Sequence, residues 1–236
     1  MLDGEHLVRE AIRAGLTIEG VLTGERAHDV DADLSALGIP HYAGTNAVLA
    51  AASPVRTSSG MVAIAEWTPQ PPERLLAVAS PLVLGLLDVQ DPGNVGSAIR
   101  SAHALGATGL LALGSTADPA GWKALRGSMG STFHLAVGRG SLAEALAAAH
   151  AHGVTVAATV AHGGDEIDRA NLAPPVLLLA GNEGAGLPAD VRAGADRRVR
   201  IPLRPGVDSL NVAVTAALVV WEIRRRASAP GRRVRP

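Results

Sequence analysis

Residues 201–214 read IPLRPGVDSLNVAV and run directly into an apolar stretch with helical spacing. Proline and glycine in this segment predict a turn. Ser209 and Asn211 are short hydrogen-bonding residues at the point where the helix is expected to begin. A turn that exposes main-chain amides and small polar side chains before a buried helix is typical of a small-molecule site. The segment therefore predicts one wall of a binding pocket rather than a plain connection.

Around this segment, from residue 82 onward, apolar runs alternate with helical stretches. Strands are expected at 82–87, 109–113, 133–137, 154–160, 176–180 and 198–201, and helices at 95–105, 122–129, 142–150 and 210–226. Two of the strands, 82–87 and 176–180, are apolar throughout, which is typical of a parallel sheet covered on both faces. The alternation predicts an α/β domain with a mostly parallel sheet, whose ligands bind at the carboxyl ends of the strands.

The first part of the chain predicts a separate, smaller α/β unit at residues 1–67. Its expected elements are a helix at 5–15, strands at 18–22 and 61–65, a short helix at 34–37 closed by Gly38, an extended piece at 39–42, and a helix through Ala52 capped by Thr45 or Asn46. Residues 68–81, TPQPPERLLAVASP, contain four prolines and predict a linker. The alternative is a long loop inside one domain. The larger domain is then expected at 82–226.

Composition narrows the class of protein. Of 236 residues, 47% are hydrophobic and none is cysteine, which allows a sizeable core and excludes disulfides, thiolate catalysis and cysteine-based zinc sites. The N-terminal residues include Asp3, Glu5 and Arg9, so the sequence predicts neither a signal peptide nor a membrane span there. The eight histidines show no ligand spacing, and no metal is expected. These features predict a cytoplasmic protein.

Charge is distributed unevenly along the chain. Residues 192–236 contain 11 basic and 3 acidic side chains, a net charge of +8, although the whole chain carries −1. One interpretation is a basic tail at 227–236, expected to be disordered. The other is phosphate binding beside the turn at 201–211.

Three loops follow predicted strands and are rich in Gly, Asn, Asp and Glu: residues 88–100, 180–188 and 201–211. The second contains Gly181, Gly184 and Gly186, but their spacing is not that of a dinucleotide-binding fingerprint, and Pro188 interrupts the stretch that follows. A Walker A lysine is also missing from these loops. Nucleotide-binding folds of those two kinds are therefore disfavoured.

The order of the loops is more specific. NVGSAIR at 94–100, LLLAGNEGAGLP at 177–188 and RIPLRPGVDSLNVAVTAAL at 200–218 resemble the three motifs of the SpoU (TrmH-like) RNA 2′-O-ribose methyltransferases of the SPOUT class. KALRGSMGSTFHL at 123–135 resembles the family's segment between the first two motifs. The N-terminal unit, from LVREAIRAG to SSGMVAIAEW, resembles the L30e-like RNA-binding domain often fused to this fold.

The resemblance implies an α/β knot: a mostly parallel sheet whose C-terminal part forms a deep trefoil knot, preceded by a small L30e-like domain. It implies a homodimer packed through the knotted domains. It also implies S-adenosylmethionine as cofactor, held mainly by main-chain groups. The residues that correspond to the cofactor site are Thr159, Leu179, Ala180, Gly181, Glu183, Ile201, Pro202, Leu203, Ser209, Leu210 and Asn211.

By the same resemblance, the catalytic residues are Asn94, Arg100, Glu183, Ser209 and Asn211. The family's arginine at position 100 is proposed to help deprotonate the ribose hydroxyl, but a free arginine is a poor base because its pKa is above about 12. Phosphate binding or lowering the pKa of the hydroxyl are the alternatives. Each residue also has a structural interpretation: Asn94 and Ser209 could be helix caps, and Glu183 a solvated loop acid.

The expected function is S-adenosylmethionine-dependent methylation of a ribose 2′-hydroxyl, in 23S rRNA rather than tRNA, because the extra N-terminal unit resembles those of rRNA-directed relatives. That unit is acidic, however, with 4 basic and 10 acidic residues in 1–73. The alternatives are a tRNA 2′-O-methyltransferase and a catalytically silent RNA-binding protein on the same fold. The nucleotide, and a housekeeping or antibiotic-resistance role, stay open.

Overall fold

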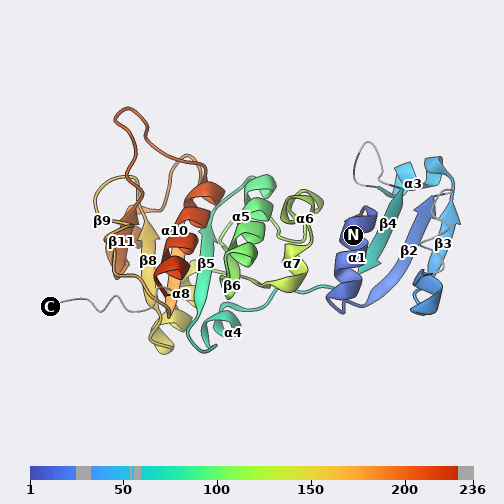
Figure 1. Ribbon diagram of the computed structural model, residues 1–236, viewed down its shortest axis with the longest axis horizontal. Coiled ribbons are helices and arrows are strands. Elements are labelled where there is room, and N and C mark those ends of the chain that lie inside the picture. The colour runs from blue at the N-terminus through green and yellow to red at the C-terminus, as the bar shows by residue number, and fades with distance from the viewer. Residues whose placement is uncertain (25–32, 54, 56–59, 228–236) are drawn as a thin grey trace.

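The computed structural model describes the whole chain except residues 25–32, 54, 56–59 and 228–236. The predicted basic tail therefore lies outside the described residues, apart from Ala227. The chain forms a small N-terminal α/β unit followed by a larger one, as Figure 1 shows. The described residues contain no helix long and apolar enough to cross a membrane.

The N-terminal unit is a four-stranded sheet in the order β1-β4-β2-β3. Only the β2–β3 pair is parallel; β4 runs antiparallel to both of its neighbours. The elements are β1 (Leu2–Asp3), α1 (Glu5–Arg13), β2 (Ile18–Gly24), β3 (His41–Gly44), α3 (Asn46–Ala52) and β4 (Met61–Ala65). Residues 33–36 are also helical, and Gly38 follows with a φ of +68°. Thr45 caps α3 by accepting a hydrogen bond from the Val48 amide, so the expected elements of this unit are confirmed.

The larger unit is a seven-stranded sheet in the order β7-β6-β5-β10-β8-β11-β9, and every neighbouring pair is parallel. The strands are β5 (Leu82–Leu87), β6 (Gly109–Leu113), β7 (Ala136–Gly140), β8 (Thr155–Thr159), β9 (Asp165–Glu166), β10 (Val176–Ala180) and β11 (Arg197–Arg200). The helices are α4 (Pro72–Leu76), α5 (Pro92–Ala104), α6 (Trp122–Ser128), α7 (Ser131–His134), α8 (Leu142–Ala151), α9 (Ala189–Gly194) and α10 (Val212–Ala227). The predicted parallel α/β domain is confirmed.

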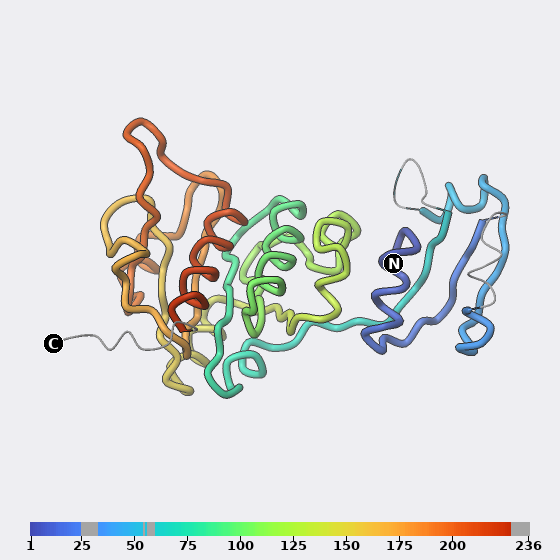
Figure 2. Tube along the Cα trace, viewed as in Figure 1, coloured from blue at the N-terminus to red at the C-terminus, as the bar shows by residue number. Residues whose placement is uncertain are grey.

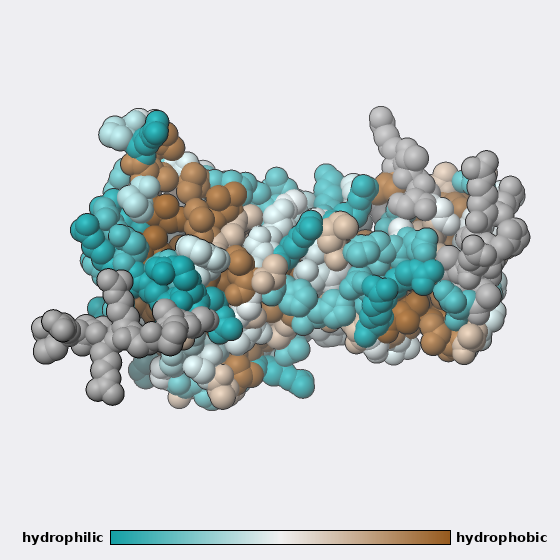
Figure 3. All heavy atoms as spheres, viewed as in Figure 1, coloured by the Kyte–Doolittle hydropathy of each residue, from teal (hydrophilic) through white to brown (hydrophobic). Residues whose placement is uncertain are grey.

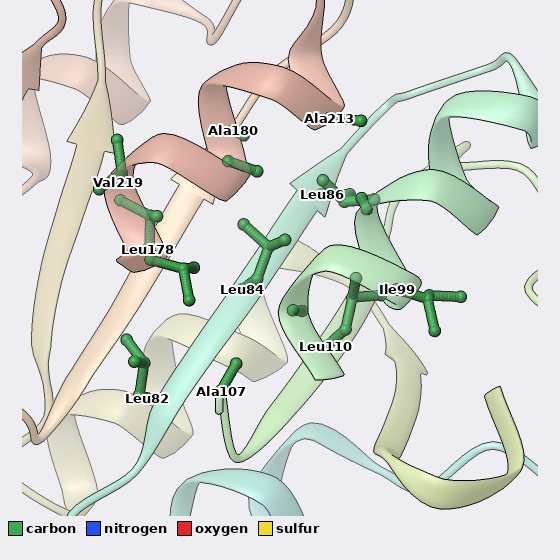
Figure 4. Packing of buried hydrophobic residues seen from close by; sticks show 14 of the residues in the cluster. Leu82, Leu84, Leu86, Ile99, Ala107, Leu110, Leu178, Ala180, Ala213 and Val219 are labelled. Atoms are coloured by element: carbon green, nitrogen blue, oxygen red, sulfur yellow. The ribbon is translucent and has the colours of Figure 1, made fainter. Parts of the chain in front are cut away.

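The central position of β5 in the sheet explains why its sequence is apolar throughout. Leu82, Leu84 and Leu86 point to one face, where α5 and α10 pack, while Val83 and Leu87 point to the other, where α4 and α8 pack. Figure 4 shows the first face, with Leu84 and Leu178 from adjacent strands beneath the helices. Because alternate side chains enter two different cores, a strand in this position has no solvent-facing side.

The segment 68–81 is more structured than a linker. It contains α4, whose Leu75 and Leu76 are 2% and 1% exposed and belong to the core on the α8 side of the sheet. Gln70 exchanges main-chain hydrogen bonds with Val137 and Arg139 beside β7. The prolines favour an extended entry at Pro71, but the two leucines that follow bind the segment to the larger unit.

The predicted strand at 133–137 is corrected. Phe133 lies in the short helix α7, and β7 begins at Ala136. Met129 and Gly130 have φ values of +51° and +85°, so the chain reverses there and starts a second helix before the strand. The apolar pattern of 133–137 did not show this reversal.

The two units meet at α1. Leu125 of α6 is part of the N-terminal hydrophobic core, and Phe133 packs against it. Glu10 of α1 receives a 2.8 Å contact from His134 Nε2, and a side chain at Gly130 would collide with the Glu10 side chain. The N-terminal unit is thus packed directly against the helices α6 and α7.

Candidate functional site: a hydrogen-bonded triad beside a cleft

Three loops at the carboxyl edge of the large sheet meet in one hydrogen-bond chain. Asn211 Nδ2 donates to Asn94 Oδ1 at 2.8 Å, and Asn94 Nδ2 donates to Glu183 Oε1 at 2.8 Å. The three side chains are separated by 89 and 117 positions in the sequence. The structure therefore brings together one residue from each predicted loop, which no single loop could indicate.

Asn94 occupies the first turn of α5 but is not its cap. Asp91 accepts the hydrogen bond from the Gly93 amide at 2.7 Å and takes the capping role, so the helix begins three residues earlier than expected. The capping interpretation of Asn94 is wrong, because Asp91 is the cap and Asn94 lies inside the helix, where its side-chain amide joins the hydrogen-bond chain between the loops.

Asn211, by contrast, has a structural role as well. Its Oδ1 accepts hydrogen bonds from the Ala213 and Val214 amides at 2.9 and 3.3 Å, which caps α10, while its Nδ2 donates to Asn94. Ser209, predicted as a possible cap, lies in the exposed loop before the helix and has no hydrogen-bond partner among the described residues. One asparagine therefore fixes the start of α10 and orients the first loop at the same time.

The loop after β10 is held by Asn182. Its Oδ1 accepts from the Gly184 and Ala185 amides at 2.8 and 3.1 Å, and its Nδ2 donates to the Asp88 carbonyl at 3.0 Å. A side chain at Gly181 would overlap the main chain at Gly186, so only glycine allows this closure. Asn182 was absent from the predicted site, although it connects the second loop to the first.

Arg100 takes no part in the hydrogen-bond chain of Asn211, Asn94 and Glu183. It lies on α5 with an exposed side chain that has no hydrogen-bond or ion-pair partner among the described residues. Gly96, one turn before it, packs against the main chain of α6 at Ala124 and Gly127. Arg100 therefore lies on the side of α5 that faces α6. Its unpaired guanidinium is available there to bind an anion.

A cleft of about 320 Å³ lies beside the triad, at the carboxyl ends of β8 and β10. Its lining comes from four segments: the end of β8, the loop after β10 with α9, the loop after β11, and the start of α10. The predicted cofactor residues that line it are Thr159, Ala180, Gly181, Glu183, Ile201, Leu203, Ser209 and Leu210. Figure 2 shows the loop between β11 and α10 extending beyond the sheet at the top of this edge.

Three predicted cofactor residues do not line the cleft. Leu179 is 0% exposed in the core, and its carbonyl accepts the Thr159 hydroxyl at 3.1 Å. Pro202 is exposed and is not part of the lining. Asn211 reaches the site through Asn94 instead.

The lining also contains residues that the sequence did not single out. They are Val160, Ala161, His162, Asn182, Gly184, Ala185, Gly186, Leu187, Arg192, Asp208, Val212 and Thr215. Most are neighbours of predicted positions and could have been included by extending each loop. Arg192 begins the basic segment 192–236, but the sequence did not assign it to the cleft, because it belongs to α9, a helix that the sequence pattern did not predict. The described residues include no cluster of three or more His, Asp or Glu side chains that could hold a metal ion.

The chain is similar to a known family of methylases and to one of its characterised relatives. Residues 81–221 match the SpoU rRNA Methylase family. The chain is 33% identical over 224 residues to the 23S rRNA (guanosine(2553)-2′-O)-methyltransferase RlmP of Bacillus subtilis, covering 95% of this chain and 88% of that protein.

Two solved structures resemble the whole chain. The AdoMet-bound rRNA methyltransferase of Sinorhizobium meliloti has a TM-score of 0.85 at 30% identity, covering 96% of this chain and 87% of that one. The SpoU methyltransferase AviRb of Streptomyces viridochromogenes, in complex with AdoMet, has a TM-score of 0.85 at 29% identity, covering 96% and 89%. The family match spans more than half of the chain and includes all three loops of the site. The chain therefore belongs to the SpoU rRNA methylase family.

Proposed function

We propose that this protein transfers the methyl group of S-adenosylmethionine to a ribose 2′-hydroxyl of 23S rRNA. The observation that carries the proposal is the Asn211–Asn94–Glu183 chain, which joins the three family loops beside the cleft. The relatives named above support the reaction and the substrate class.

The residues of the cleft fit this cofactor. Ile201 and Leu203 supply apolar surface suited to a flat adenine, while the loop glycines leave main-chain groups accessible. The volume of about 320 Å³ lies at the lower end of the range usual for small-molecule sites, roughly 300–1,000 Å³. Glu183 and Asp208 add negative charge that favours a cationic ligand. The cofactor, when bound, supplies a methyl group on a positively charged sulfur.

The triad orients the groups that handle the substrate. In methyl transfer the ribose 2′-oxygen releases its proton to solvent water and forms the new bond to the methyl carbon, while the carbon–sulfur bond breaks and the sulfur keeps the electron pair. Glu183 accepts a hydrogen bond from Asn94 Nδ2 and thereby fixes the orientation of the Asn94 side-chain amide. Asn94 and Asn211 are then held as hydrogen-bonding groups beside the cleft, through Glu183, which lines it. Positioning of the ribose by such groups is worth several orders of magnitude in rate.

Arg100 acts on the substrate by its charge in this proposal. Its exposed, unpaired guanidinium suits a phosphate or a developing oxyanion, and either contact lowers the pKa of the neighbouring hydroxyl. Action as the proton acceptor itself is disfavoured, since the guanidinium stays protonated in proteins.

Arg100→Ala tests this assignment. Methyl transfer should fall by about 100-fold or more, the size expected for loss of one preorganised electrostatic contact, while the dissociation constant of S-adenosylmethionine changes little. Arg74→Ala is the matched control, an exposed arginine on α4, which packs on the opposite face of the sheet from α5. Full activity of Arg100→Ala would remove Arg100 from the reaction.

We also propose rRNA rather than tRNA as the substrate, with the N-terminal unit as an L30e-like RNA-binding domain. In support, the similarity to the two solved methyltransferase structures extends over 96% of the chain and therefore includes most of residues 1–67. Activity on ribosomal RNA is in turn the reason for proposing the cytoplasm as its location.

We further propose a homodimer through a trefoil-knotted C-terminal domain. The supporting observation is an apolar stripe along the outer side of α10 and the loop before it. Its members Leu210, Val214, Leu218 and Trp221 are 37%, 48%, 42% and 50% exposed. Figure 3 shows brown, hydrophobic surface gathered over this region. Residues at this spacing share one helix face, and an apolar face of this kind favours association with a second copy.

A further inference from the structure

We propose that Arg192 binds the carboxylate of the methionine part of S-adenosylmethionine and so gives the cleft its preference for the intact amino-acid end of that molecule. The inference rests on the cofactor proposed above and assigns a new residue within the same cleft. Arg192 lies outside the three family loops that suggested the cofactor site.

Arg192 is placed at the cleft by the fold around it. The loop after β10 closes on Asn182 and ends at Leu187, which is 3% exposed and packed into the core on the α8 side. Val191 of α9 packs against that same core. These two anchors hold α9 against the sheet, and Arg192, next in sequence, lines the cleft with an exposed side chain.

Its positive charge distinguishes Arg192 from the other residues that line the cleft. Among the described residues that line the cleft, it is the one arginine, and no lysine accompanies it. Its guanidinium has no hydrogen-bond or ion-pair partner among the described residues, whereas Arg139, Arg200 and Arg226 each have an acidic partner. A cation that faces a binding cleft without a partner retains its hydrogen-bonding capacity for a ligand.

S-adenosylmethionine offers one group that matches. It carries two positive groups, the sulfonium and the ammonium, and a single negative one, the carboxylate. Glu183 and Asp208 line the cleft and favour the positive groups, and Arg192 is the complementary cation for the carboxylate. Arginine is suited to this contact because its planar fork can donate two parallel hydrogen bonds to one carboxylate.

The test compares three ligands by isothermal titration calorimetry on the full chain. S-adenosylmethionine has the carboxylate, decarboxylated S-adenosylmethionine lacks only that group, and 5′-methylthioadenosine lacks the whole amino-acid end. The unchanged protein should bind S-adenosylmethionine about 10-fold more tightly than its decarboxylated form, the effect expected of one charge-assisted contact.

Arg192→Ala should weaken S-adenosylmethionine by about 10-fold and bring its affinity close to that of the decarboxylated form. It should leave 5′-methylthioadenosine unchanged, and Arg192→Lys should retain part of the preference. Arg74→Ala is the matched control, an exposed arginine on another short helix with no ion pair among the described residues, and should behave like the unchanged protein.

Two results would overturn the assignment. One is an Arg192→Ala variant that keeps the full preference for the carboxylate-bearing ligand. The other is an equal loss for all three ligands, which would mean that Arg192 supports the shape of the cleft instead. Failure of the unchanged protein to bind any of the three would contradict the cofactor itself, and is thereby distinguishable from failure of the Arg192 assignment.

Discussion

Asn94 is the residue on which the site depends, because its amide is used at both ends. Its oxygen accepts from Asn211 and its nitrogen donates to Glu183, each at 2.8 Å. An asparagine can do both at once, whereas an ionised aspartate only accepts. Aspartate at this position would also place a second carboxylate against Glu183. The hydrogen bonds to Asn211 and Glu183 therefore require an amide at position 94, and not merely a side chain of that size.

Asn94→Asp should consequently lower the rate of methyl transfer by about 100-fold, the scale of losing an oriented catalytic group. The affinity for S-adenosylmethionine should stay within a few-fold, since Asn94 does not line the cleft. Ser97→Ala, at an exposed position on the same helix, is the control. Single-turnover methylation and calorimetry measure the two quantities, and an unimpaired rate in Asn94→Asp would exclude the proposed role of the amide.

Glu222 gives a prediction about pH. Its side chain receives hydrogen bonds from Arg225 and Arg226, which lower its pKa from the usual 4.5 to about 2. Arg226 also donates to the Ala170 carbonyl at 2.6 Å and so ties α10 to the loop before β10. Because the folded pKa is the lower one, the ionised carboxylate contributes stability above about pH 4.5, and that contribution is lost as pH falls toward 2.

Glu222→Gln should therefore lower the melting temperature at pH 7 by roughly 2–8 °C, the range for losing ~1–2 kcal/mol in a chain of this size. The difference from the unchanged protein should shrink as pH is lowered from about 4.5 toward 2. Glu19→Gln, an exposed acid on β2, is the control for general charge effects. A difference in melting temperature that is constant from pH 7 to pH 3 would disprove the linkage.

At the level of elements, the contact between α5 and α6 depends on Gly96. A methyl group there would overlap the Ala124 carbonyl and lie 2.9 Å from the Gly127 Cα, so the helices would have to separate. Gly96→Ala should destabilise the fold by about 1–3 kcal/mol, the usual cost of overpacking, even though alanine is the better helix former.

Gly194→Ala is the comparison, since nothing lies within 4 Å of the added group. Urea denaturation of the two variants separates the steric effect from helix propensity. Equal stability of Gly96→Ala and the unchanged protein would show that α6 can move away without cost.

Element prediction succeeded where one core decided the pattern. The strand at 176–180 has the predicted bounds, because all five of its residues are buried between two helix layers. It failed where contacts between residues distant in sequence determine the local structure. Leu75 and Leu76 lie in α4, which is held by their packing into the core on the α8 side of the sheet. Helix α9 has no buried residue, so no apolar pattern marks it. The triad was predictable residue by residue, but its two hydrogen bonds depend on the sheet order that places β5 next to β10.

At the scale of the whole molecule, the stripe on α10 makes a prediction about assembly. Leu218→Glu places a charge in the middle of that apolar face and should convert the proposed dimer to a monomer in light scattering coupled to size-exclusion chromatography. Leu37→Glu, which alters an exposed leucine in the N-terminal unit, is the control. An unchanged molar mass for Leu218→Glu would place any dimer interface elsewhere.

The proposed reaction is tested by following the methyl group. Full-length protein is incubated with unmodified 23S rRNA and S-adenosylmethionine carrying a labelled methyl group, and the RNA is digested to nucleosides and analysed by mass spectrometry. The proposed reaction should place label in a single 2′-O-methylnucleoside, at an initial rate about 100-fold lower with Asn94→Asp. Label on a base, or no transfer to 23S rRNA while the protein binds the cofactor, would contradict it.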